Sequence, residues 1–275
     1  MPRIAILQMT SGVDPADNAD RIVTAAREAA GAGAEMLFTP EMAGLLDKDR
    51  KRAAANIVPE SENRQVERIA DAAAQGGIWI AFGLPVARED GRWANRTLLF
   101  DAQGNVAARY DKIHMFDVEL DTGEAWRESS AYMPGEQVVT VPDTPLGRLG
   151  LTICYDIRFP ALFEELGRRA CDAIAIPAAF TVPTGQAHWH LLQRARAVEA
   201  SAFVIAAAQV GEHADGRRTY GHSLIVDPWG EVLLDMDGEN AGLGICEVSL
   251  DRITEVRRQL PSLANKRDIP KSQSQ

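Results

Sequence analysis

Residues 150–160 read Gly-Leu-Thr-Ile-Cys-Tyr-Asp-Ile-Arg-Phe-Pro, an apolar, β-rich run that ends at Cys154 and then turns abruptly polar. This pattern predicts a thiol at the end of a strand. Two earlier apolar stretches also finish on a reactive side chain, the carboxylate of Glu41 and the amine of Lys112. Three strand ends can therefore bring a carboxylate, an ammonium and a sulfur together, and we expect these side chains to converge.

The first half of the chain alternates strand-like and helical patterns. We predict strands at 3–9, 35–40 and 78–83 and helices at 18–30 and 63–75. In the second helix, apolar residues recur at the i, i+3, i+4 and i+7 positions that form one buried stripe. Alternation of strands and helices is typical of an α/β protein.

The second half adds a hairpin and several further strands. Strands at 96–100 and 106–110 are separated by a short turn-forming segment, so part of the sheet must be antiparallel. After a polar loop at 117–136, we predict strands at 138–141, 148–153, 173–177, 203–209, 223–226, 232–234 and 243–248, and helices at 160–169, 187–200 and 251–259. Many strands with a few amphipathic helices indicate two sheets packed face to face with helices outside.

The chain shows no seam between two domains. Its 275 residues, of which 46% are apolar, are enough for a substantial core, and no repeat or low-complexity segment interrupts them. We therefore predict a single domain over residues 1–260, followed by a polar C-terminal tail at 261–275.

Charge and cysteine content limit the expected partners and setting. The formal net charge of −10, from 29 basic and 39 acidic residues, opposes attraction to nucleic acid and to anionic membranes. We interpret the short basic cluster at residues 48–52 as a solvated loop. The apolar runs are far shorter than the ~20 residues that span a bilayer, no secretory leader is evident, and three cysteines fit reduced thiols. We predict a cytoplasmic protein.

Cys154, Glu41 and Lys112 are the residue types that amide hydrolysis through a thioester requires. A cysteine with its ordinary pKa of ~8.5 is mostly protonated at neutral pH, so a neighbouring base must take its proton. Glu41 is the candidate base. The Lys112 ammonium is the candidate group for stabilising the negative charge that develops on the substrate.

Other interpretations remain open at this point. Free cysteines are among the most buried residue types, so Cys154 has a structural alternative, and we assign Cys171 and Cys246 to packing. A histidine base is the competing catalytic design, for which the chain offers His114, His188, His190, His213 and His222.

We predict neither a metal nor a cofactor. His188 and His190 are two residues apart on a predicted helix, so they cannot bind one metal as an i, i+4 pair would. The chain also lacks a glycine-rich phosphate loop and a dinucleotide-binding fingerprint.

Three ordered blocks of sequence resemble the signatures of the nitrilase (carbon-nitrogen hydrolase) superfamily. They are Thr-Pro-Glu-Met at 39–42, Tyr-Asp-Lys-Ile-His-Met-Phe-Asp at 110–117 and Leu-Thr-Ile-Cys-Tyr-Asp-Ile-Arg-Phe-Pro at 151–160. The similarity continues through residues 177–199 and 206–230, so it covers nearly the whole chain.

The resemblance implies a fold, an assembly and a set of catalytic residues. The fold is a four-layer α-β-β-α sandwich with two mixed sheets. The assembly is a homodimer or a larger homo-oligomer, with residues 261–275 at the interface. The catalytic set is a Glu-Lys-Cys triad of Glu41, Lys112 and Cys154, and Glu128 matches a second glutamate used in such families.

The implied reaction is hydrolysis of a linear amide through a cysteine thioester. Lys112 and the backbone N–H of Tyr155 would hold the oxyanion, while Glu128 would orient Lys112. Two carboxylates beside one ammonium are expected to keep one carboxyl pKa raised.

The implied substrate is a small-molecule amide that carries a carboxylate. Residues 206–223 resemble the deaminated glutathione amidase branch more than the omega-amidases, which act on α-ketoglutaramate. Arg158 offers a bidentate fork for the carboxylate, with a structural ion pair as its alternative, and Phe180 and Thr181 are implied as further substrate contacts. A nitrilase, an N-carbamoyl amino acid hydrolase and a non-enzymatic interaction protein are the rival functions.

Overall fold

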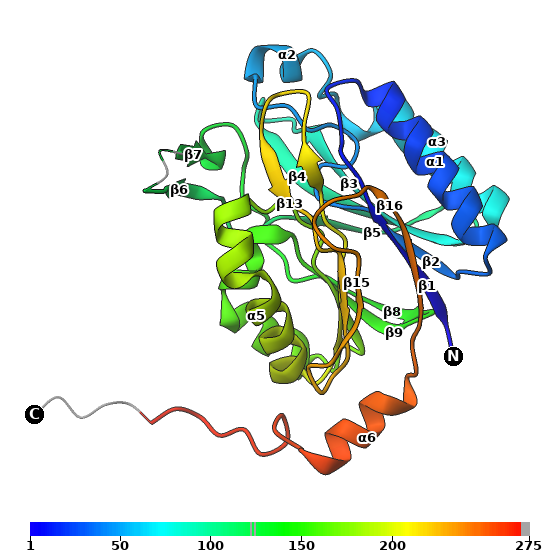
Figure 1. Cartoon of the computed structure of the whole chain (residues 1–275), viewed down its shortest axis with the longest axis vertical. Helices are drawn as coiled ribbons and strands as arrows, with labels where there is room; N and C mark the ends of the chain where they lie inside the picture. The colour runs from blue at the N-terminus through cyan, green and yellow to red at the C-terminus, as the bar shows by residue number, and fades with distance from the viewer. Residues whose placement is uncertain (122, 124, 271–275) are drawn as a thin grey trace, which may run out of the picture.

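Two six-stranded sheets form the centre of the computed structural model, which describes residues 1–121, 123 and 125–270 (Figure 1). The first sheet has the order β16-β1-β2-β3-β4-β5, formed by Gly242–Glu247, Arg3–Gln8, Met36–Phe38, Trp79–Ala87, Trp93–Phe100 and Val106–Asp111. The second has the order β15-β14-β11-β10-β9-β8, formed by Val232–Asp235, Leu224–Val226, Phe203–Ala206, Ala173–Ala175, Gly147–Leu151 and Thr140–Thr144.

Both sheets are mixed, as the sequence predicted. Strands β1, β2 and β3 are parallel, while β16, β4 and β5 pair antiparallel with their neighbours. In the second sheet β9, β10 and β11 are parallel and the outer strands are antiparallel. The parallel strands are joined by crossovers that contain helices, whereas short turns join β3 to β4, β4 to β5, β8 to β9 and β14 to β15.

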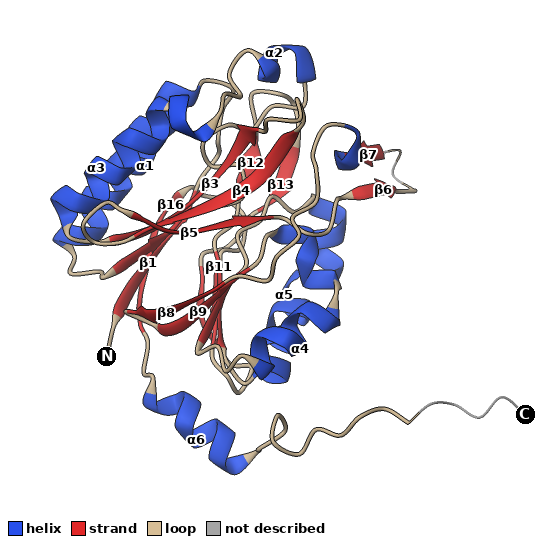
Figure 2. Ribbon diagram, turned by 180° about the vertical axis from the view of Figure 1, so that it is seen from behind, coloured by secondary structure: helices blue, strands red, loops and turns tan. Residues whose placement is uncertain are grey.

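Helices cover the outer face of each sheet. Helices α1 (Pro15–Gly31) and α3 (Arg64–Gly76) lie together over the first sheet, and α4 (Pro160–Arg168) and α5 (Val182–Ala200) lie over the second (Figure 2). This arrangement is the predicted four-layer α-β-β-α sandwich.

Residue alternation along β1 divides the core into two layers. Ile4 and Ile6 face the second sheet and join the cluster that contains Leu149 of β9. Ala5 and Leu7 face the opposite way and pack in the cluster beneath the outer helices α1 and α3. This period of two is the geometry of a strand buried on both faces.

The helix boundaries follow their capping residues. Helix α1 begins after Asp14, whose carboxylate accepts a 2.8 Å hydrogen bond from the N–H of Ala16. Helix α5 begins at Val182, five residues before the predicted start, because Pro183 lies in the first turn, where proline costs no hydrogen bond. The predicted helix at 251–259 is confirmed as α6 (Asp251–Gln259).

Several short elements were not predicted. The segment interpreted as a solvated basic loop contains a one-turn helix, α2 (Arg50–Ala54), capped by Asp49. The polar segment at 117–136 contains the strands β6 (Asp117–Glu119) and β7 (Ala125–Arg127) and the 3₁₀ turn η2 (Glu128–Ser130). A further two-stranded sheet joins β12 (Val210–Glu212) to β13 (Arg218–Tyr220). Three-residue strands carry no periodic signal, which explains why the sequence missed them.

The C-terminal region leaves the body of the sandwich after β16. Helix α6 and residues 260–270 lie outside the four layers (Figures 1 and 2). The last five residues of the predicted tail, 271–275, lie outside the described part of the chain. None of the helices described is both long enough and apolar enough to cross a membrane.

Candidate active site

Glu41 follows the end of β2. The chain passes from Phe38 through Thr39 and Pro40 and runs against β3, where Gly83 makes the close approach possible. A Cβ atom at Gly83 would lie 2.3 Å from the carbonyl oxygen of Pro40. Thr39 fixes the approach, because its N–H donates to Ala81 and its Oγ1 accepts from the N–H of Gly83.

Lys112 follows the end of β5, and its backbone is held on both sides. Its N–H donates to the carbonyl of Asn95 on β4, at 2.9 Å, and its own carbonyl accepts from Gly135, at 2.8 Å. The side chain is 2% exposed. An ammonium buried this deeply requires acidic partners, because burial of an unpaired charge is very costly.

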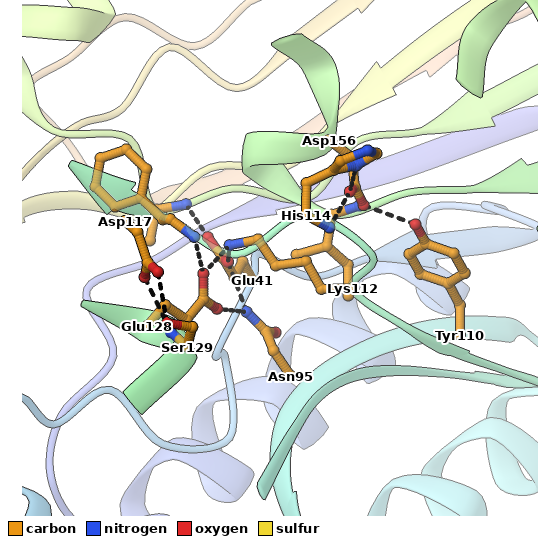
Figure 3. A network of polar contacts seen from close by, with 12 residues as sticks. Glu41, Asn95, Tyr110, Lys112, His114, Asp117, Glu128, Ser129 and Asp156 are labelled. Carbon is orange, nitrogen blue, oxygen red and sulfur yellow. Dashed lines mark hydrogen bonds and ion pairs between the residues drawn. The ribbon is translucent and has the colours of Figure 1, made fainter. Parts of the chain in front are cut away.

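Two carboxylates supply those partners (Figure 3). Lys112 Nζ lies 2.9 Å from Glu41 Oε1 and 2.8 Å from Glu128 Oε2. The side-chain amide of Asn95 donates to both carboxylates, at 2.8 Å to Glu41 and 3.0 Å to Glu128. Backbone N–H groups complete the cluster, since Ala179 donates to Glu41 at 2.9 Å and Phe116 to Glu128 at 2.7 Å.

The cluster keeps opposite charges on Glu41 and Lys112. Burial alone would raise the pKa of the Glu41 carboxyl, but the Lys112 charge and hydrogen bonds from Cys154, Lys112 and Asn95 bring the pKa below its ordinary value. Burial would lower the pKa of Lys112, whereas Glu128 and Glu41 raise it well above its ordinary value. The sequence-based expectation of a raised carboxyl pKa is therefore wrong for Glu41, because the hydrogen bonds and the cation outweigh burial.

Cys154 begins the 3₁₀ turn η3 (Cys154–Arg158), just after β9. Its φ of 49° lies in the left-handed region, which non-glycine residues rarely adopt and which often marks functional turns. Burial and the negative charge of Glu41 raise the pKa of the thiol well above its ordinary value, and Lys112 offsets only part of this. The raised pKa favours the thiol over the thiolate in the resting side chain.

Asp156 holds the turn that carries Cys154. Its fully buried carboxylate accepts hydrogen bonds from the N–H of Ile153 at 2.9 Å and from the hydroxyl of Tyr110 at 2.7 Å. The N–H of His114 donates to it as well, at 3.0 Å (Figure 3). The His114 ring stacks on Phe159.

One open cleft, with about 1130 Å³ of empty space out to its mouth, is lined by Glu41, Lys112, Glu128 and Cys154. No histidine is among the described residues that line it, so the geometry does not support a histidine base. The structure instead pairs His190 with His222 and Asp235, outside this cleft; these three could hold a metal ion.

The remaining predicted site residues also line the cleft: Tyr155, Arg158, Phe180 and Thr181. The Arg158 guanidinium lies 5.9 Å from the centre of the Tyr155 ring and 5.5 Å from that of Phe180. Within the described residues, no acidic side chain forms an ion pair with Arg158, which counts against the structural alternative.

Sequence reasoning missed three contributors to the site. Asn95 interrupts the apolar pattern at the edge of a predicted strand, which is a weak signal of a special role. Ala179 and Phe116 act through backbone N–H groups, which carry no side-chain signal at all.

A family model described as carbon-nitrogen hydrolase matches residues 3–258. The chain belongs to the carbon-nitrogen hydrolase family. This membership confirms the resemblance to the nitrilase superfamily. As a carbon-nitrogen hydrolase, the protein is an enzyme that acts on amide-type bonds.

Relatives of this carbon-nitrogen hydrolase are similar over nearly its whole length. A deaminated glutathione amidase from Yersinia enterocolitica is 40% identical over 270 residues, which are 97% of this chain and 93% of that protein. The crystal structure of the Caenorhabditis elegans NitFhit protein matches with a TM-score of 0.89 at 33% identity, covering 97% of this chain but only 65% of that longer chain.

A solved amidase from Nesterenkonia sp. is informative about chemistry. It matches with a TM-score of 0.79 at 28% identity and covers 95% of this chain and 98% of that one. In that structure, a glutamate-to-glutamine variant carries the product of Michael addition of acrylamide at its active-site cysteine.

Proposed function

We propose that the protein hydrolyses a linear amide through a thioester on Cys154. The observation that carries this proposal is the buried contact of Lys112 with both Glu41 and Glu128 in the cleft that Cys154 lines. Glu41 takes the thiol proton as Cys154 Sγ attacks the amide carbon. The Lys112 ammonium and the backbone N–H of Tyr155 stabilise the oxyanion.

Glu41 also serves the remaining steps of the reaction. Glu41 returns its proton to the leaving nitrogen, so that ammonia or an amine departs and the acyl group stays on sulfur. Glu41 then deprotonates a water molecule, which attacks the thioester. The C–S bond breaks, the acid leaves, and Glu41 returns the proton to the sulfur of Cys154. Its lowered pKa supports this role, because the carboxylate is ionised when it takes the proton from the thiol and from water. Glu128 holds Lys112 in place throughout.

Replacement of the nucleophile tests the proposal without changing the charge of the cluster. We expect Cys154→Ala to lose all measurable turnover while its circular dichroism stays that of the native fold. Cys246→Ser is the matched control, because that thiol lies on β16 outside the cleft. After rapid acid quenching, mass spectrometry should find the acyl group on Cys154. An acyl group elsewhere, or native activity in Cys154→Ala, would contradict the mechanism.

We propose deaminated glutathione as the substrate. The 40% identity to a protein of that name and the guanidinium of Arg158 in the cleft, which forms no ion pair with a described carboxylate, support it. This substrate carries a 2-oxo acid carboxylate, which suits the planar fork of arginine. Comparison of kcat/KM for deaminated glutathione, α-ketoglutaramate, a nitrile and an N-carbamoyl amino acid tests the assignment. A higher kcat/KM for any of the other three would contradict it.

We further propose that residues 1–260 form one catalytic unit that assembles as a homodimer. Leu191 and Val198 are 66% and 41% exposed and lie seven residues apart, on one stripe of α5. Trp229, 50% exposed, lies in the turn before β15, next to Gly230, which packs close to Val198. An exposed apolar patch of this kind supports an interface, with the tail beside it. Light scattering of the native chain and of Leu191→Glu tests this assembly.

A cytoplasmic setting is part of the same proposal. The three cysteines are all free thiols, which suits a reducing compartment. Fractionation of cells that express the full chain would test it.

A further inference from the structure

A strongly basic hollow continues outward from the catalytic cleft. Of the nine described residues that line it, none is acidic and five are cationic: Lys48, Arg50, Arg127, Arg217 and Arg218. All five also line the cleft itself. The hollow is thus positive in a chain whose net charge is −10. A concave surface of one sign concentrates ions of the opposite sign.

Three of these cations have no acidic partner among the described residues. Arg217 pairs with Asp215 at 2.8 Å, and Arg127 lies 3.9 Å from Glu119. Lys48, Arg50 and Arg218 form no ion pair with any described residue. Like charges that lie together without counter-ions repel one another, and an anionic ligand would relieve that repulsion.

The proposed substrate carries a second carboxylate where this hollow could receive it. Deaminated glutathione has a 2-oxo acid at its acyl end, and its leaving group is a cysteinylglycine dipeptide that ends in a carboxylate. Arg158, between the rings of Tyr155 and Phe180, is assigned to the acyl end. The leaving group must therefore extend from the scissile bond along another wall of the cleft.

We propose that Lys48, Arg50 and Arg218 form a subsite for a carboxylate on the leaving-group side of the substrate. This inference rests on the proposed function and extends it, because it assigns the preference for a peptide-like leaving group to the hollow. Trp126 and Val182 add apolar surface beside the cations, where the side chain of the departing dipeptide can pack.

Two substrates that share an acyl group and differ in the leaving group measure the contribution of the subsite. Hydrolysis of α-ketoglutaramate and of deaminated glutathione passes through the same α-ketoglutaryl thioester, and only the leaving group differs. Lys48 and Arg218 are the residues to change, because within the described chain neither side chain forms a hydrogen bond with the protein. Arg50 is left intact, since it donates to Arg127 and Ser130, which adjoin Glu128.

The double variant Lys48→Gln/Arg218→Gln should raise KM for deaminated glutathione by about tenfold or more, as expected for loss of two charge-assisted contacts. Its kcat/KM for α-ketoglutaramate should stay within about twofold of the native value, because that substrate has no leaving-group carboxylate to contact these cations. Arg27→Gln, which removes one positive charge from an exposed position on α1, is the surface control and should change the kinetics of neither substrate.

A third substrate completes the test. Deaminated glutathione with its glycine carboxylate converted to an amide should bind the native enzyme more weakly than the acid does, and the double variant, which keeps only Arg50 of the subsite, should distinguish the two far less than the native enzyme does. Equal losses on α-ketoglutaramate and deaminated glutathione, or no loss on either, would overturn the subsite while the function stands. Failure of the native enzyme to hydrolyse either amide would instead overturn the proposed function, and the subsite with it.

Discussion

The side-chain amide of Asn95 donates a 2.8 Å hydrogen bond to Glu41, the carboxylate proposed as the catalytic base. The same amide group reaches Glu128 at 3.0 Å, so Asn95 fixes the separation of the two carboxylates that share Lys112. Asn95 is 1% exposed, and among the described residues the hydrogen bonds of its side chain go to these two carboxylates. We therefore regard it as a positioning residue.

Asn95→Leu should lower kcat by about ten- to a hundredfold, the scale of losses seen when a supporting contact is removed. The acid limb of kcat/KM should also move to higher pH. The hydrogen bond from Asn95 lowers the pKa of Glu41, so its loss raises that pKa. Because Glu41 works as the ionised base, activity would then be lost at a higher pH as the solution is acidified.

Thr97→Val is the matched control for Asn95. Thr97 lies two residues along the same strand, is buried, and its hydroxyl has no hydrogen-bond partner among the described residues. The variant keeps the side-chain size and should leave the acid limb unchanged. An identical pH profile for Asn95→Leu and the native enzyme would refute the positioning role.

Glu41→Gln should separate thiol reactivity from catalysis. The charge of Glu41 and its hydrogen bond both raise the pKa of Cys154, whereas Lys112 lowers it. Removal of the charge should therefore lower the thiol pKa and let iodoacetamide alkylate Cys154 at a lower pH. Amide hydrolysis should nevertheless fall by about a hundredfold or more, because the general base is lost.

The alkylation rate is best measured across pH in a Cys246→Ser background, which removes the half-buried thiol on β16. If the rise of the alkylation rate with pH moved to higher pH in Glu41→Gln, Glu41 would not be the group that repels the thiolate. Full amide hydrolysis in the same variant would exclude Glu41 as the base.

Local sequence signals were sufficient to locate the strand ends that carry Glu41, Lys112 and Cys154. In each case an apolar run stops at a polar, chemically reactive residue, and the structure brings the three to one cleft. The two-sheet architecture followed from the same periodicity, because strands and helices differ in their apolar repeat.

Long-range partners could not be predicted in this way. Asp156 accepts hydrogen bonds from Tyr110 and His114, which lie more than forty residues earlier in the sequence. No local sequence pattern predicts pairs so far apart. The basic cluster at 48–52 was interpreted as a solvated loop, yet Lys48 and Arg50 line the cleft. A charged side chain has the same sequence signal whether it faces bulk water or a ligand site.

Arg158→Ala should raise KM for 2-oxo acid amides by about tenfold or more, the value of one charge-assisted contact to a carboxylate. Both α-ketoglutaramate and deaminated glutathione should be affected, because they share the acyl end. A neutral amide of similar size should lose far less. Steady-state kinetics on the three substrates checks this, and equal losses on all of them would indicate that Arg158 supports the cleft rather than the substrate.

Gly185→Ala should destabilise the first turn of α5 and weaken substrate binding. A Cβ atom there would lie 2.2 Å from Cγ of Tyr220, so the helix and β13 must move apart. Overpacking of this kind costs about 1–3 kcal/mol of unfolding free energy. The start of α5 carries Thr181 and Thr184, which line the cleft, so KM should rise with the loss of stability.

Gly31→Ala is the matched control for Gly185, because an added Cβ at the end of α1 would meet no atom within 4 Å. Alanine favours a helix over glycine, so its unfolding free energy should stay equal or rise slightly. Urea denaturation of the two variants and the native chain, followed by tryptophan fluorescence, gives the comparison. A Gly185→Ala protein as stable as Gly31→Ala would mean that Tyr220 can move aside without cost, and that the start of α5 is not fixed by this contact.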